Sequence, residues 1–133
     1  MATNPQYAAT PGRANVAAST TANTAIDGTG SNFVSVVSGT ANGRRIRRVA
    51  VTGAASTGAA NSIRFFISLD SGTTKRFLCD VLLAAATISQ TVRGQYAEVP
   101  ELVGLILQGT TTQLLITNST TQATNVDCEY ADL

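Results

Sequence analysis

The chain has 133 residues, enough for one domain with its own core, and its nine Lys and Arg against eight Asp and Glu give a formal net charge of +1. This balance provides no overall attraction to nucleic acid or to an acidic membrane surface. Histidine, the side chain best suited to acid–base work near neutral pH, is absent, and so is tryptophan. We therefore expect a non-enzymatic structural or binding module with no cofactor, no nucleic-acid partner and no membrane partner.

The first 26 residues differ in composition from the rest of the chain. Met1 to Ile26 is rich in Ala, Thr, Asn and Ser, and its single charge is Arg13. Such a segment has too few apolar side chains to offset the entropy lost when it becomes ordered on its own. We predict an extended N-terminal arm over residues 1–26 that is ordered by a neighbouring subunit, with residues 16–26 adding an edge strand. The alternative is a disordered tail. In either case we predict that residues 27–133 form a single β-sandwich domain.

Short apolar runs separated by turn residues predict strands through the remainder of the chain. The strands are expected at 33–37, 45–52, 62–69, 75–83, 91–99, 102–107, 113–118 and 125–131, and 102–107 is alternatively a buried crossing. The pair 62–69 and 75–83, joined by a turn at 70–73, is the clearest hairpin, with Leu69 and Phe77 among the residues predicted to face inward. About eight strands and almost no helix predict an all-β, two-sheet antiparallel sandwich, jelly-roll-like in the first instance and immunoglobulin-like in the second.

One strand has an irregular apolar pattern. In the run Arg44 to Val51, Ile46 has the opposite parity to Val49 and Val51. All three can face the core only if the strand contains one extra residue. We predict a β-bulge near Arg47 and Arg48.

The same strand contains the densest group of charges in the sequence. Arg44, Arg45, Arg47 and Arg48 offer planar donors that suit carboxylates and phosphates. No aromatic residues alternate with them, as stacking on single-stranded nucleic acid would require. We predict a contact with another subunit or protein, and the alternative is a solvated strand whose charge is balanced by the acidic residues Asp127, Glu129 and Asp132.

A second candidate contact is apolar. Phe66, Leu78 and Leu82 have the parity opposite to the predicted core residues of the hairpin, so they form an apolar patch on its outer face. Such patches usually contact protein, which predicts a homo-oligomer. In the alternative, a loop or the N-terminal arm covers these side chains within one chain.

Catalytic and metal-binding patterns are weak. Glu98 and Glu101 are the nearest carboxylate pair, but their spacing around Pro100 is typical of a polar loop. No calcium-loop spacing is present among the acidic residues, and we expect no catalytic residues and no metal site. Cys79 and Cys128 have no CxxC spacing and are predicted to be free, buried thiols, with a disulfide as the minority alternative.

The order of four motifs over residues 33–133 resembles that of small virion proteins of tailed bacteriophages. The motifs are ANGRRIRRV (41–49), IRFFI (63–67), FLCDV (77–81) and LLIT (114–117). The chain looks like a head decoration, or cement, protein. The resemblance implies a homo-oligomer, often a trimer, made in the host cytoplasm and bound to the major capsid protein on the head surface. The four arginines, Phe66, Leu78, Leu82 and the arm over 4–23 would then make the contacts.

Two other functions remain open. A tail or fibre module that binds a host-surface glycan would use the same sandwich, although the chain offers few aromatic residues for stacking on sugars. A small shell protein with a single jelly roll is the third interpretation.

Overall fold

The computed structural model describes residues 10–133, in which it contains eleven strands, one short 3-10 helix and no α-helix. The elements in chain order are β1 (Thr10–Ala17), β2 (Val34–Ser38), β3 (Arg44–Gly53), β4 (Thr57–Gly58), β5 (Asn61–Ser68), β6 (Arg76–Leu83), β7 (Ala86–Thr87), β8 (Tyr96–Glu98), η1 (Pro100–Leu102), β9 (Ile106–Leu107), β10 (Gln113–Asn118) and β11 (Thr124–Asp132).

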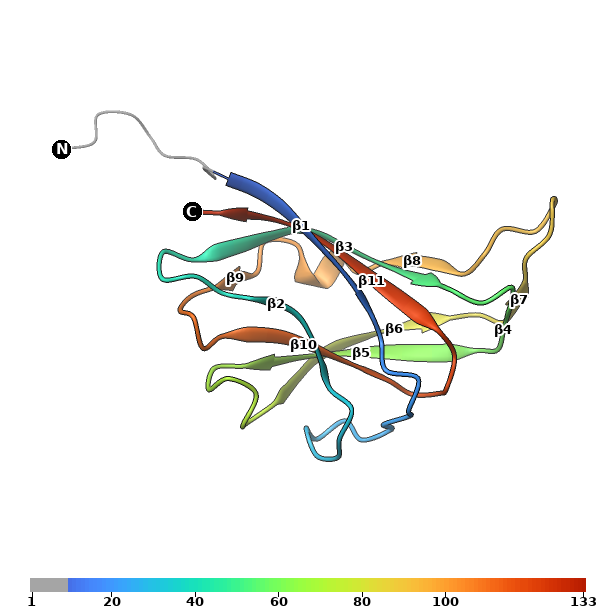
Figure 1. Ribbon diagram of the computed structural model, residues 1–133, viewed down its shortest axis with the longest axis horizontal. Helices are drawn as coiled ribbons and strands as arrows, with labels where there is room; N and C mark the ends of the chain where they lie inside the picture. Colours follow the sequence, from blue (N-terminus) through green and yellow to red (C-terminus); the bar gives the residue numbers. More distant parts are fainter. Residues whose placement is uncertain (1–9) are drawn as a thin grey trace.

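Two antiparallel sheets pack face to face, so the predicted all-β sandwich is confirmed (Figure 1). The strand order is β1-β11-β3-β8 in the first sheet, where β9 also pairs with β3, and β2-β10-β5-β6 in the second. The two-residue strands β4 and β7 pair with each other and lie at the end of the sandwich away from the start of β1 and the end of β11 (Figure 1).

The core lies between the two sheets and consists of the inward-facing residues of both. Alternation along each strand places one apolar residue in every two on this inner face. The residues that are almost completely buried there include Ile46, Val49, Val51, Val126 and Cys128 from the first sheet and Ile63, Phe65, Leu114 and Ile116 from the second.

The separate arm predicted over residues 1–26 is not confirmed in the part of the chain that the structure describes. Residues 10–17 form β1, which pairs antiparallel with β11 from Thr10↔Asp132 to Ala17↔Asn125 in the same chain. Ala14 and Val16 face the core and Arg13 faces outward. This short alternation is enough to form a strand, because β11 supplies the backbone hydrogen-bond partners. The sandwich therefore includes residues 10–17, ahead of the expected boundary at residue 27, and residues 1–9 of the expected arm, including the contacts assigned to 4–9, lie outside the described residues.

The connection from β1 to β2, residues 18–33, lies along the second sheet. The backbone N–H of Asn23 donates to the carbonyl of Asn118 at 2.8 Å, and the Asn23 side chain donates to the carbonyls of Thr29 and Ser31 at 3.2 and 2.7 Å. At the end of the connection, the ring of Phe33 meets that of Phe66 edge to face, with 5.1 Å between the centroids. The connection is thus fastened to the outer face of the second sheet.

The predicted hairpin is present as β5 and β6, but with a bulge that changes its outer face. Phe65 pairs with Cys79 and Phe66 pairs with Phe77, so Leu78 is the extra residue. Phe77 consequently lies beside Phe66 instead of facing the core, with 5.7 Å between the ring centroids. Leu69 is also not inward-facing: β5 ends at Ser68, and Leu69 is 68% exposed.

The region after β7 contains less strand than predicted. Within 91–99 only Tyr96–Glu98 is a strand, and within 102–107 only Ile106–Leu107. Pro100 begins the 3-10 helix η1, because its fixed φ suits the first position of a helix and it has no N–H to donate to a sheet.

Candidate functional site

The bulge in β3 divides the four arginines into three environments. Glu129 of β11 pairs with Arg48, and Tyr130 pairs with Ile46, so Arg47 is the extra residue. Ile46, Val49 and Val51 are all buried, which confirms the predicted bulge. As a result Arg44 has the inward parity of Ile46, whereas Arg48 lies on the outer face of the sheet.

Arg44 is held inside the end of the sandwich. Its Nε and Nη2 donate to the two carboxylate oxygens of Asp132 at 2.6 and 3.1 Å, and its Nη1 donates to the carbonyl of Ser38 at 3.0 Å. Its guanidinium carbon lies 4.0 Å from the ring centroid of Tyr130. The hydrogen bonds raise the pKa of Arg44 and lower that of Asp132. Because its guanidinium makes three hydrogen bonds and one ring contact within its own chain, Arg44 acts as a structural residue and not as a free contact.

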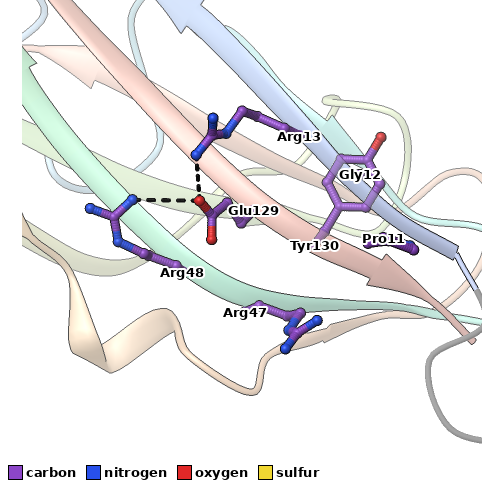
Figure 2. A pocket seen from close by; sticks show the side chains of 7 residues that line it. All are labelled: Pro11, Gly12, Arg13, Arg47, Arg48, Glu129 and Tyr130. Carbon is purple, nitrogen blue, oxygen red and sulfur yellow. Dashed lines mark hydrogen bonds and ion pairs between the residues drawn. The ribbon is translucent and has the colours of Figure 1, made fainter.

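Arg48 belongs to a ladder of charges across the outer face of the first sheet. Its Nε donates to Glu98 of β8 at 3.0 Å, and its Nη1 lies 3.9 Å from Asp127 and 3.7 Å from Glu129 of β11. Arg13 of β1 forms ion pairs with the same two residues of β11. Figure 2 shows Glu129 between Arg13 and Arg48. The acidic residues that the sequence suggested as balancing charges therefore do balance Arg44 and Arg48.

A shallow hollow of about 600 Å³ lies beside this ladder. We call it the arginine hollow, and it is lined by Pro11, Gly12, Arg13, Arg47, Arg48, Glu129 and Tyr130. Arg47 stands apart from the ladder, with its guanidinium directed away from Glu129 (Figure 2). Arg45 and Arg47 are exposed, and neither forms an ion pair within residues 10–133. These two arginines are available to bind carboxylates or phosphates of a partner.

The predicted apolar patch is only partly exposed. Phe66 has 0% of its surface exposed, because Phe33 of the β1–β2 connection and Phe77 of β6 cover it within the chain. The expectation that Phe66 contacts another subunit is therefore wrong. Leu78 and Leu82 do reach the surface, with 37% and 74% exposed, and both lie on β6, the edge strand of its sheet.

Two further groups of exposed apolar side chains were not predicted as contacts. Leu69 and Phe77 adjoin the tip of the β5–β6 hairpin, and Val103, Ile106 and Leu133 are exposed near β9 and the end of β11. A Cβ at Gly43 would lie 3.3 Å from Ile106 and 3.4 Å from Leu133, which places these two side chains close together. The alternation of the hairpin predicted Leu69 and Phe77 to face inward, and no periodic signal marks Val103 or Ile106, which lie in a turn and in a two-residue strand.

The acidic residues were also considered as metal ligands. No cluster of three or more His, Cys, Asp or Glu residues suitable for a metal occurs within the described part of the chain. The carboxylate of Glu98 accepts hydrogen bonds from Arg48 and from the Tyr96 hydroxyl, each at 3.0 Å, and these lower its pKa. A carboxylate held ionised in this way is poorly suited to act as a general acid.

Both cysteines are free thiols. Cys128 is buried and Cys79 is half-buried. Burial raises the pKa of Cys79 to about 11 and that of Cys128 to about 12. Both thiols are therefore protonated near neutral pH and act as small core residues.

Comparison of the chain with protein-family models, with curated proteins and with solved structures finds no match. Among residues 10–133 there is also no helix of the length and apolar character needed to cross a membrane.

Proposed function

We propose that this chain is a non-enzymatic structural protein of a bacteriophage virion, a capsid decoration protein that binds the assembled head as a homotrimer. The observation that carries the proposal is a division of the exposed surface. Arg45 and Arg47 extend from the first sheet without intrachain ion pairs, and Leu78 and Leu82 extend from the edge of the second. A cationic surface for an acidic shell and a separate apolar surface for another copy are what a cement protein needs.

Such binding depends on many weak contacts repeated over the shell, and it needs no catalytic step. Each contact with a shell is weak, because exposed ion pairs contribute about 0.2–1 kcal/mol each in water. An oligomer that presents several copies of the arginine hollow to a symmetric lattice binds much more tightly than one copy does. The stiff sandwich supports this role, because it keeps the cationic and apolar surfaces at a fixed separation.

The nested strand pairing supports the more detailed proposal that the sandwich is a jelly roll. The first long strand pairs with the last (β1 with β11), the second with the last but one (β2 with β10), and the inner strands pair as β3 with β8 and β5 with β6. Such nesting is what a long antiparallel ribbon produces when it is rolled into two sheets.

The test is co-sedimentation of the labelled chain with separated heads and tails of the phage that encodes it. We expect saturable binding to heads, and at least a tenfold loss of affinity in the double variant Arg45→Glu, Arg47→Glu. The control is Arg93→Glu, a charge reversal at an exposed position between β7 and β8, outside the residues proposed as contacts; it should bind like the parent chain and is compared with the single variant Arg47→Glu, which makes the same change in charge.

Two results would overturn the proposal. Binding to tails, or to host-surface polysaccharide with no binding to heads, would instead favour the glycan-binding module. Sedimentation velocity at micromolar concentration tests the oligomer separately: a trimer that Leu82→Arg dissociates is expected, and a monomeric parent chain would contradict it.

A further inference from the structure

We infer that β1 is an exchangeable strand: in the oligomer, β1 of one copy pairs with β11 of a neighbouring copy, in the place that its own β1 occupies in a closed monomer. The inference rests on the oligomer of the proposed function and goes further, because it names the segment that joins the copies. It commits to one occupant for the edge of β11, namely residues 10–17 of a second copy of this chain.

The pairing of β1 with β11 is specific in register. Gly12 lies opposite Tyr130, and a Cβ at this position would overlap the Tyr130 ring. A slip by one residue would place Pro11 or Arg13 against that ring. Arg13 lies opposite Glu129 and forms an ion pair with it. β11 therefore recognises this segment by shape and by charge, whichever copy supplies it.

Apolar burial holds β1 only weakly to its own sandwich. Ala14 and Val16 are its core-facing apolar side chains, and both are only half-buried. The remaining residues of β1 are exposed apart from Gly12. As an edge strand it has a single neighbour in its sheet. Specific register combined with little buried apolar surface is what allows a strand to leave one copy and pair with another.

The charges left behind when β1 departs are still compensated. Asp127 and Glu129, the ion-pair partners of Arg13, each also lie within 4.0 Å of an Arg48 nitrogen. An opened copy therefore presents a β11 edge whose carboxylates keep a partner, ready for the Arg13 of a second copy.

The hinge for this exchange is residues 19–22. It lies between two fixed points, the bond from Ala18 N–H to Thr124 and the bond from Asn23 N–H to Asn118. Ser19 is half-buried, and Thr20, Thr21 and Ala22 are exposed. Five residues from Asn23 to Ala18 span at most about 17 Å when extended. The exchanging neighbour must therefore lie against the side of the sandwich where β1 and β2 form the sheet edges.

The native Cys128 provides the test, because Ala14 lies directly opposite it in the register. In a Cys79→Ser background, Ala14→Cys places two thiols across the β1–β11 pair. After mild oxidation, or reaction with a short bifunctional thiol reagent, the products are separated on a denaturing gel without reductant. We expect covalently linked copies, up to the size of the oligomer seen by sedimentation of the same sample. The control Ala17→Cys, which lies opposite Asn125, should give no linkage to Cys128.

Each other outcome identifies what has failed. A linkage within single chains in a sample that sediments as an oligomer would overturn the exchange and leave the proposed oligomer intact. A linkage within single chains in a monomeric sample would overturn both. If the buried Cys128 gives no linkage, the same comparison is made with Arg13→Cys and Glu129→Cys, an outward-facing pair in the same register, and failure of this pair as well would overturn the pairing and with it the inference.

Discussion

Replacing Phe66 with alanine tests whether this side chain belongs to the core of one chain or to a contact between chains. Phe66 is completely buried beneath Phe33 and Phe77, with ring centroids 5.1 and 5.7 Å away. Removing a buried phenylalanine costs about 3–5 kcal/mol, and this includes two aromatic contacts of about 0.5–1.5 kcal/mol each. For a slope of about 2 kcal/mol/M in urea, a loss of about 4 kcal/mol lowers the unfolding midpoint by about 2 M.

The assay is urea unfolding followed by far-ultraviolet circular dichroism at one fixed protein concentration, with sedimentation velocity on the same samples. Phe66→Ala should lower the midpoint and leave the oligomeric state of the folded protein unchanged. The control is Val92→Ala, whose side chain is 45% exposed and lies outside both proposed contact surfaces, and whose removal should change stability by less than about 0.5 kcal/mol. A loss of less than about 1 kcal/mol in Phe66→Ala together with dissociation of the oligomer would refute the assignment of Phe66 to the core.

Three further predictions concern other parts of the chain. Arg44→Ala should destabilise the protein by about 1–2 kcal/mol, because its part-buried hydrogen bonds to Asp132 and to the Ser38 carbonyl are lost, whereas Arg45→Ala should stay within about 0.5 kcal/mol; the same urea assay compares them, and equal losses would contradict the division of the arginines. Hydrogen bonds from the turn backbone and from a serine hydroxyl lower the pKa of Asp70 from 3.8 to about 2. The unfolded chain then takes up this proton at higher pH than the folded one, so stability falls as the pH drops from about 3.8 to about 2. Urea midpoints over this interval should fall less steeply in Asp70→Asn, and equal slopes would show that Asp70 does not contribute. Maleimide labelling at pH 8, read by mass spectrometry, should be slow in the folded protein and should reach half-buried Cys79 before Cys128; equal rates would contradict the burial of Cys128.

The two bulges show what a single sequence reveals about strand register. The bulge at Arg47 is predictable, because charged residues surround Ile46 and only an extra residue allows Ile46, Val49 and Val51 to be buried together. The bulge at Leu78 is not, because Leu78 is flanked by apolar residues on both sides and either parity buries an apolar side chain. The register of a strand can be predicted from one sequence only where its polar and apolar residues alternate clearly.

The burial of Phe66 and the pairing of β1 could not be predicted from the sequence, because each depends on a distant segment of the chain. The burial of Phe66 depends on Phe33, which precedes it by more than thirty residues and lies at the end of a connection without apolar periodicity. Likewise β1 consists of small and polar residues, and it is a strand because β11 provides hydrogen-bond partners along its whole length. Local composition describes how much apolar surface a segment can bury, but not which distant segment covers it or pairs with it.

The pairing of β1 with β11 has a consequence for how the protein is made. Arg13 and Glu129, which form an ion pair, are separated by 116 positions in the chain. A growing chain therefore holds residues 10–17 without their strand partner until residue 132 has left the ribosome, and contacts of such long sequence separation form slowly. During this interval β1 is a segment without a strand partner, so the β11 of another copy can compete with its own β11 for it.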